Sequence, residues 1–175
     1  MKNIVATLLF LTTISMAAPL SEQDIQQLEK RKIKEHIIYE TYLETDKGLA
    51  SVFGYQFDTF FNDHQCFILA ISGAVNGERG GYGFAAFGLG QEIPLIEQVS
   101  LNLRGFIGSG GGGGLAAGGG LMLEGHIGLV YHLSNTFGIE INTGYLAFPT
   151  GTFESPMVNL GIQFSEHQVF LPWNN

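Results

Sequence analysis

Residues 121–147, LMLEGHIGLVYHLSNTFGIEINTGYLA, decide the fold of this chain. Large apolar side chains occupy every second position up to the short polar segment 134–136, and the same alternation resumes after it. A period of two is the pattern of a β-strand with one apolar face. A three-residue link between two such runs predicts an antiparallel hairpin.

The length of the loop and the alternation on each side of it also predict the register of the hairpin. With residues 134–136 as the loop, apolar side chains meet in pairs: Leu133 with Phe137, Tyr131 with Ile139, and Leu129 with Ile141. Gly125 then lies opposite Tyr145, and we expect the aromatic ring to cover the glycine. A shift by one residue would turn Glu140 onto the apolar face, because neighbouring positions of a strand face opposite ways.

The same alternation extends in both directions along the chain. It predicts strands at residues 36–44, 50–61, 65–76, 81–91, 98–108, 120–133, 136–148 and 156–164, although 36–44 also fits one face of a helix. The second face carries mostly Gly, Ser, Asn and Gln, which suits a crowded lumen, whereas the large apolar face suits lipid. The sequence therefore predicts an all-β fold, a closed antiparallel up-and-down transmembrane β-barrel of about eight strands.

The two ends of the chain differ from this middle. Lys2, an apolar run at residues 4–16 and the small residues around Ala17 have the pattern of a signal peptide over residues 1–17. Residues 18–35 are rich in charge and predict a short, helical, periplasmic N-terminal arm. Residues 36–164 form the predicted barrel, and residues 165–175 follow it as a C-terminal tail.

Composition excludes several functions. The 175 residues carry a formal net charge of −8, so the chain cannot neutralise a run of phosphates and no nucleic-acid partner is expected. Cys66 is the only cysteine, which rules out a disulfide within the chain. The histidines His36, His64 and His167 have no companions at metal-ligand spacing. We therefore predict no cofactor and no metal site.

The polar face supplies the candidate site residues. The strongest candidates for a buried polar network in the lumen are Arg104, Glu124, His126 and Glu140. We expect Arg104 to pair with Glu124, since an isolated buried charge is costly, and we expect side chains to fill an eight-stranded lumen. The outer aromatic girdle is predicted at Tyr82, Tyr145 and Phe148, and the inner one at Tyr131 and Phe137. The glycine run 109–119 predicts a flexible outer loop that folds inward as a lid.

Over residues 36–164 the chain resembles the small outer-membrane β-barrel proteins of Gram-negative bacteria. Such barrels finish on an aromatic residue, and the segment from Val158 to Phe164 looks like that ending; Phe170, Leu171 and Trp173 are the alternative. The resemblance implies export to the bacterial outer membrane and assembly by the barrel-assembly machinery. It also implies contact with outer-membrane lipids or lipopolysaccharide, and a structural, envelope-interaction or surface-contact role.

Two other functions stay open at this point. The segment His132-Leu133-Ser134-Asn135 resembles the short signature of the outer-membrane lipid A deacylases, in which Ser134 would be the nucleophile and His132 its base. Glu140 would orient His132 in that lipid-modifying hydrolase, although an ordinary polar turn is the preferred interpretation and no catalytic residue is expected. The other alternative is a soluble periplasmic barrel that binds a small apolar ligand.

Overall fold

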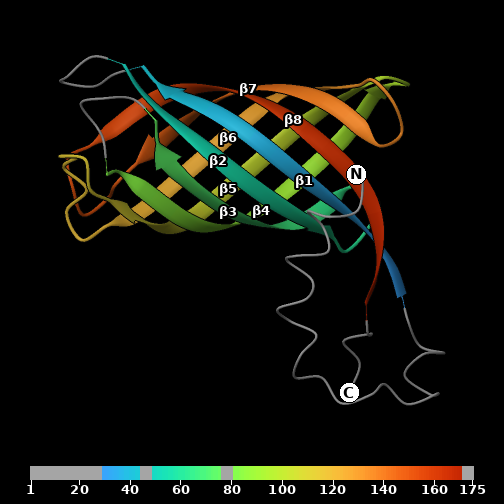
Figure 1. Ribbon diagram of the computed structural model, residues 1–175, viewed down its shortest axis with the longest axis horizontal. Coiled ribbons are helices and arrows are strands. Elements are labelled where there is room, and N and C mark those ends of the chain that lie inside the picture. The colour runs from blue at the N-terminus through green and yellow to red at the C-terminus, as the bar shows by residue number, and fades with distance from the viewer. Residues whose placement is uncertain (1–28, 44–48, 76–80, 171–175) are drawn as a thin grey trace, which may run out of the picture. The chain divides into compact units, whose positions relative to one another are not determined.

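The computed structural model of the chain is a closed barrel, and it describes residues 29–43, 49–75 and 81–170 (Figure 1). Its strands are β1 (Glu29–Tyr42), β2 (Ala50–Phe60), β3 (Gln65–Ala74), β4 (Gly83–Ile96), β5 (Val99–Gly111), β6 (Leu121–His132), β7 (Phe137–Ala147) and β8 (Glu154–Phe170). They follow one another in chain order around the barrel. The predicted fold class is confirmed. The compact unit that contains the barrel is Arg31–Gln168.

The strands are joined by short and long links in alternation. The short links, residues 61–64, 97–98 and 133–136, lie at what we call the turn end, and the longer ones lie at the loop end. In the described part of the chain, no helix is long and apolar enough to cross a membrane.

The predicted hairpin register is confirmed. Leu129 lies opposite Ile141 and Gly125 lies opposite Tyr145. The Leu133 N–H donates to the Phe137 carbonyl at 3.0 Å, which closes the turn. The expected cover of Gly125 by the aromatic ring is wrong, because a Cβ placed on Gly125 would meet only the Arg104 carbonyl oxygen, at 3.9 Å. The space above this glycine is open.

The strand ends differ from the predicted ones, most of all at the start of β1 and at the ends of β4 and β8. β1 begins at Glu29, so residues 29–35 of the predicted helical arm are strand, and 36–42 are strand rather than helix. The charged start of this strand is stable in the barrel because Lys34 turns inward and forms an ion pair with Glu92 of β4. β4 runs on to Ile96 with a bulge between Pro94 and Ile96, which shortens the link to β5 to two residues. The predicted signal peptide and the start of the arm lie outside the described residues.

The C-terminal end of the barrel is longer than predicted as well. β8 does not stop at Phe164 but continues to Phe170, so the first part of the predicted tail is strand. Phe164 lies opposite Phe137 in the register, and the two rings are 5.4 Å apart. Residues 171–175, which include the alternative ending at Leu171 and Trp173, lie outside the described residues.

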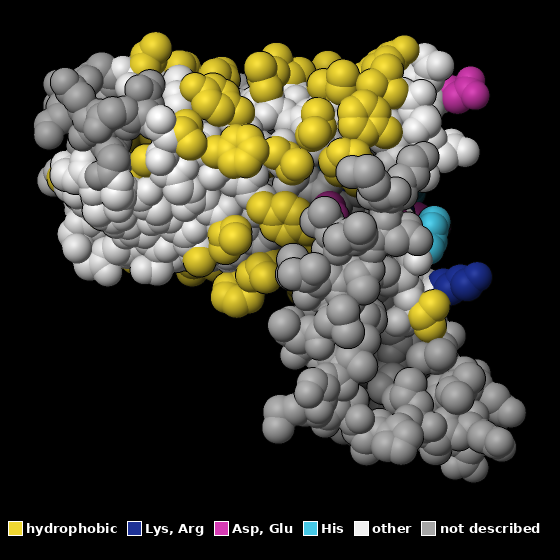
Figure 2. Space-filling model, in the orientation of Figure 1, with side chains coloured by type: hydrophobic (Ala, Val, Ile, Leu, Met, Phe, Trp, Pro, Cys, Tyr) yellow, Lys and Arg dark blue, Asp and Glu magenta, His cyan; other side chains and the backbone are white. Residues whose placement is uncertain are grey.

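The barrel is apolar on the outside and polar within. Figure 2 shows hydrophobic side chains spread over the visible outer face of the strands. Ile141, for example, is 57% exposed, whereas its neighbours along β7, Glu140 and Asn142, are buried. A sheet in water has the opposite arrangement, with its apolar face buried and its polar face solvated.

The loop end of the lumen is filled by an apolar core rather than by polar groups. Its members include Tyr42, Tyr82, Phe84, Met122, Leu146, Phe148, Phe153 and Met157. Tyr82 and Phe148 are only 3% and 2% exposed, so their predicted place in an outer girdle is wrong. Tyr82 faces inward together with Phe84, two positions along, and Phe148 faces inward together with Leu146. The rings of Tyr82 and Phe148 pack edge to face, with their centroids 6.5 Å apart.

The glycine-rich segment folds over this apolar core. Thr152 N–H donates to the Ala116 carbonyl at 2.9 Å, and Gly119 N–H donates to Thr150 Oγ1 at 3.0 Å, so the loop is tied to the link between β7 and β8. Gly118 has φ +58°, and a Cβ there would lie 1.8 Å from the Thr150 carbonyl oxygen. Only glycine fits this contact, which brings the buried Ala117 onto the core.

Candidate functional site

A central cluster of charged side chains crosses the middle of the lumen. His36 places Nε2 3.0 Å from Asp58 Oδ2 and Nδ1 3.0 Å from Glu140 Oε1. Arg104 Nη2 lies 3.0 Å from the same Asp58 oxygen and 3.8 Å from Glu140 Oε2. All four residues are buried. With His36 protonated, this central cluster holds two positive and two negative groups.

Neutral amides complete the central cluster. Arg104 Nη1 donates to Gln56 Oε1 at 2.6 Å, and Asn102 Nδ2 donates to Glu140 Oε2 at 3.3 Å. Buried charges are tolerated when they are both paired and hydrogen-bonded. The cluster joins β1, β2, β5 and β7 and therefore ties the walls of the barrel together.

A second group of polar side chains occupies the lumen at the turn end. Lys34 forms an ion pair with Glu92 and donates to Gln163 Oε1 at 3.3 Å. His132 lies beside them, with Nε2 3.0 Å from Ser100 Oγ and 3.6 Å from Glu92 Oε1. We call these five residues the turn-end cluster.

The third group is made of Glu40, Glu124 and His126, on the side of the central cluster that faces the loop end. His126 Nε2 is in contact with Glu124 Oε1 and lies 3.8 Å from Glu40 Oε2. The ring of Phe106 packs against the His126 ring, with centroids 5.1 Å apart. We call these three residues the carboxylate cluster.

The four polar residues singled out in the sequence all lie inside the barrel, but in two different groups. Arg104 and Glu140 belong to the central cluster, whereas Glu124 and His126 belong to the carboxylate cluster. The expected pair of Arg104 with Glu124 is therefore wrong. In the register Arg104 lies opposite His126, and Glu124 lies one inward position nearer the loop end, opposite Phe106.

Sequence reasoning missed the partners that β1 and β2 contribute. These are Lys34, His36, Glu40, Gln56 and Asp58. The signal was present, because Lys34, His36, Ile38, Glu40 and Tyr42 share one parity and are all buried. It was hidden because the high charge of this segment is equally typical of a solvated arm.

The structure does not bring the three deacylase candidates together. Ser134 Oγ accepts hydrogen bonds from the backbone N–H groups of Thr136 and Phe137, at 3.3 and 3.1 Å, inside its own turn. His132 is bonded to Ser100 instead, and Glu140 is held by His36 in the central cluster. Nucleophilic catalysis needs the base within hydrogen-bond reach of the nucleophile, so this arrangement is that of a structural turn.

A groove in the outer surface is the other candidate site. Gly105 and Gly125 are register partners that both face outward, so the floor of the groove is bare backbone. Leu89 and Tyr145 flank the two glycines in the same row. A Cβ on Gly105 would have no atom within 4 Å, which shows how open this strip is.

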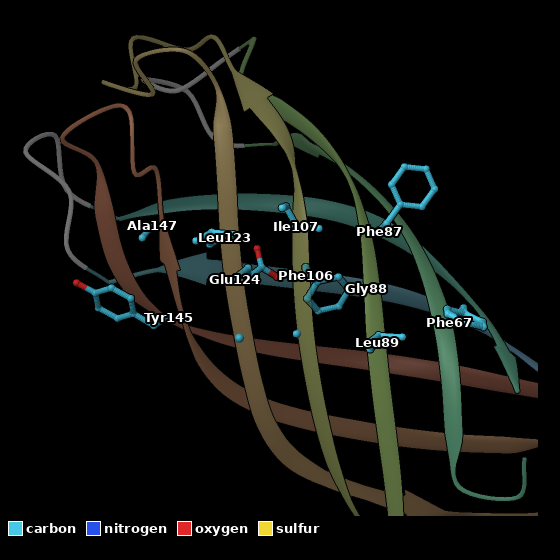
Figure 3. Close-up of a pocket in the computed structure, with 12 residues that line it drawn as sticks. Phe67, Phe87, Gly88, Leu89, Phe106, Ile107, Leu123, Glu124, Tyr145 and Ala147 are labelled. Carbon is cyan, nitrogen blue, oxygen red and sulfur yellow. The ribbon is translucent and has the colours of Figure 1, made fainter. Parts of the chain in front are cut away.

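Large apolar side chains close the groove toward the loop end. Figure 3 shows these lining residues and the Tyr145 ring, which points away from the middle of the groove. The row nearest the loop end is Phe87, Ile107, Leu123 and Ala147. The groove has a volume of about 850 Å³, and a second one of about 420 Å³ shares Leu89 and Gly105 with it. Together they follow the strands from Phe87 to Gln91, about 13 Å.

Solved structures of low sequence identity share this architecture. The N-terminal β-barrel domain of Pseudomonas aeruginosa OprF matches with TM-score 0.61 and 13% identity, over 77% of this chain and 97% of that chain. The Yersinia pestis outer membrane protein Ail, solved in a phospholipid bilayer nanodisc, matches with TM-score 0.51 and 16% identity, over 78% and 99%. This chain has the fold of the small outer-membrane barrels.

A designed transmembrane β-barrel is similar as well, with TM-score 0.56 and 11% identity, over 77% of this chain and 95% of that chain. No family model and no curated protein matches the sequence. A designed barrel and natural ones thus share this fold at 11–16% identity. Identity this low shows a shared fold alone, so the function of this barrel depends on its own side chains.

Buried side chains occupy the lumen in the described part of the barrel. The central and turn-end clusters fill the lumen on one side, and the apolar core closes it at the loop end. Eight strands enclose an interior that side chains fill. Both grooves described above open on its outer surface.

Proposed function

We propose that this protein is a non-conducting barrel of the bacterial outer membrane that acts through its outer surface, where it binds an acyl chain of an envelope lipid. The observation that carries the proposal is the distribution of side chains. Charged groups are paired inside a filled lumen, whereas the outside is apolar and holds the groove over Gly105 and Gly125. The likeness in fold to outer-membrane proteins supports this location.

The same observation argues against the soluble ligand-binding barrel. Such a protein would hold an apolar ligand in its lumen and would turn polar side chains to water. Here the lumen is filled, and large apolar side chains such as Phe87, Leu89 and Ile107 are exposed on the outside. The exposed apolar surface of a soluble monomer rarely forms one continuous patch of this extent.

Contact with an acyl chain in the groove depends on packing rather than on exclusion of water. Lipid tails are as apolar as leucine, so the hydrophobic effect does not favour the groove over the bulk bilayer. Each additional pair of carbon atoms in contact contributes about 0.1–0.2 kcal/mol. About five such contacts give roughly 0.7 kcal/mol, or about a threefold preference for the groove.

The first test of this function is the location and closure of the barrel. We expect the protein in the outer-membrane fraction, running as a compact band in an unboiled detergent gel and as a slower band after boiling. The shift follows because every backbone hydrogen bond of a closed barrel is internal and resists detergent. Recovery in the soluble periplasmic fraction, with no shift on boiling, would contradict the proposal.

The second test maps the contacts with lipid. The barrel is reconstituted in vesicles that contain a phospholipid with a photoactivatable acyl chain, irradiated, and analysed by peptide mass spectrometry. We expect labelling of Leu89 and Leu123 at about three times the level of Ile139, which lies on the apolar face outside the groove. Repeating the experiment with added lipopolysaccharide shows which of the two lipids competes for the groove.

Two glycine substitutions make this experiment specific. Gly105→Leu fills the groove from its floor and is expected to bring the labelling down to the level of Ile139. Gly73→Leu is the matched control, because Gly73 also has no atom within 4 Å of its Cβ position but lies on β3, away from the groove. Equal labelling of all outward positions in the unchanged protein would show that the groove holds no particular chain.

A further inference from the structure

The carboxylate cluster brings three metal-ligating side chains to one point in the lumen. Glu40 comes from β1, and Glu124 and His126 come from β6, across the barrel. One ligand atom from each, a carboxylate oxygen or an imidazole nitrogen, lies within 4.8 Å of the others. All three side chains are buried.

One oxygen of each carboxylate in this cluster has no hydrogen-bond partner among the described residues. Glu40 Oε1 and Glu124 Oε2 are both buried and unpaired, and His126 Nε2 is in contact only with the other oxygen of Glu124 and, at 3.8 Å, with Glu40 Oε2. A buried polar atom is destabilising when nothing replaces the water it has lost. Two unpaired carboxylate oxygens beside one imidazole nitrogen, all on metal-ligating residues, indicate a ligand that binds the three side chains together.

The charge of the cluster leads to the same conclusion. The central cluster sets Arg104 and His36 against its two carboxylates, and the turn-end cluster sets Lys34 against Glu92. The ion pairs of Glu40 and Glu124 involve only His126, with no Lys or Arg among the described residues. Two buried carboxylates beside one imidazole lack positive charge, which a divalent cation would supply.

We propose that Glu40, Glu124 and His126 bind one divalent first-row transition-metal ion, such as Zn²⁺ or Mn²⁺. An imidazole nitrogen with two carboxylate oxygens suits these ions, whereas Mg²⁺ and Ca²⁺ prefer oxygen ligands alone. Ligands 2.0–2.2 Å from a Zn²⁺ ion lie up to about 4 Å apart. The three side chains need only small rotations to reach that spacing.

The surroundings of His126 fit a metal ligand. Asn159 Nδ2 lies 3.3 Å from His126 Nδ1, the ring nitrogen that points away from the two carboxylates. With the amide oxygen and nitrogen of Asn159 and of its partner Asn142 exchanged, Asn159 Oδ1 accepts a hydrogen bond from His126 Nδ1–H, and such a partner orients a metal-bound imidazole. The sequence analysis singled out Glu124 and His126 but predicted no metal site, because Glu40 is more than 80 residues from the other two ligands.

The site is enclosed, so we expect the ion to enter while the barrel folds. Tyr42, Tyr82 and Phe148 pack above it at the loop end, and the central cluster lies below. A metal bound there is expected to resist a chelator added after folding. Metal that binds to exposed histidines, such as His64, would be removed by the same treatment.

The test is to fold the full chain in detergent with Zn²⁺ or Mn²⁺ present, dialyse against a chelator, and count the metal by mass spectrometry. We expect one ion per chain in the unchanged protein, and at least about tenfold less in the double variant Glu40→Gln, Glu124→Gln. Glu92→Gln is the matched control, because Glu92 is a lumen carboxylate of the turn-end cluster and should leave the count at one. The unboiled gel band shows that each variant has folded.

A second measurement uses the unchanged protein alone and keeps the proposal testable if the double variant does not fold. In protein labelled with ¹⁵N-histidine, folding with Zn²⁺ is expected to shift the ring-nitrogen signals of one of the five histidines. The proposal is overturned if no chelator-resistant metal is found and no histidine shifts. It is also overturned if the folded double variant retains as much metal as the unchanged protein, since the ion would then be adventitious.

Discussion

Replacing Arg104 by methionine is expected to lower the free energy of unfolding of the barrel by about 3–5 kcal/mol. The substitution keeps a flexible, unbranched side chain, shorter than that of arginine, and removes its charge. Asp58 and Glu140 then remain buried with His36 as the only positive group of the central cluster. The cost comes from the unpaired carboxylate that is left behind, more than from the lost contact itself.

The measurement is a denaturant titration of the barrel in lipid vesicles, in which the unboiled gel band reports the folded fraction. Lys32→Met is the matched control, since Lys32 is partly exposed and lies 4.0 Å from Glu92, where an ion pair contributes about 0–1 kcal/mol. Adding Asp58→Asn to Arg104→Met restores the charge balance and should recover part of the loss. An Arg104→Met barrel as stable as the unchanged one would show that water, not Arg104, compensates the carboxylates.

The second large effect is expected on the outer face. Ile141→Arg should lower the free energy of unfolding in a bilayer by about 2–4 kcal/mol, because Ile141 lies in the middle of β7 and faces outward. A charged group at the centre of the bilayer loses its hydration, and bending of the side chain toward the surface, local thinning of the bilayer and penetration of water relieve only part of that loss.

The same titration checks this prediction in vesicles. Asn135→Arg places the same charge in the exposed turn between β6 and β7, where the cost should be close to zero. The difference between the two variants reports the depth of each position in the membrane. Equal stabilities would mean that Ile141 faces water, and the assignment of the outer face to lipid would then fail.

Local patterns predicted most of the wall of this barrel. Alternation in 121–147 was enough to place Leu129 opposite Ile141, because a hairpin register depends on a short loop and on residues close in sequence. Alternation also separated the inward Glu140 from the outward Ile141. Both features are local, and each strand repeats them.

The contents of the lumen were harder to predict, because they depend on strands that meet only when the barrel closes. Glu124 pairs with His126 rather than with Arg104 because the stagger between β5 and β6 moves it by one inward position. Tyr82 and Phe148 lie directly beside the ends of β4 and β7, and aromatic rings at strand ends are equally common at a membrane interface. The charges of β1 resembled those of a solvated arm until their partners on β4, β2 and β7 were known.

The ion pairs of the central cluster also affect the order of events during folding. His36 and Glu140 are separated by 104 residues, and Arg104 and Asp58 by 46, so neither pair can form inside a hairpin. His36 and Asp58 can already pair across the β1–β2 hairpin, but until β1 and β8 meet Glu140 lacks its His36 partner and needs water in its place, so the unfinished lumen must stay wet. The pairing of β1 with β8 and the loss of water from the lumen are therefore one step. A chain with so many contacts between distant residues reaches this step late in folding.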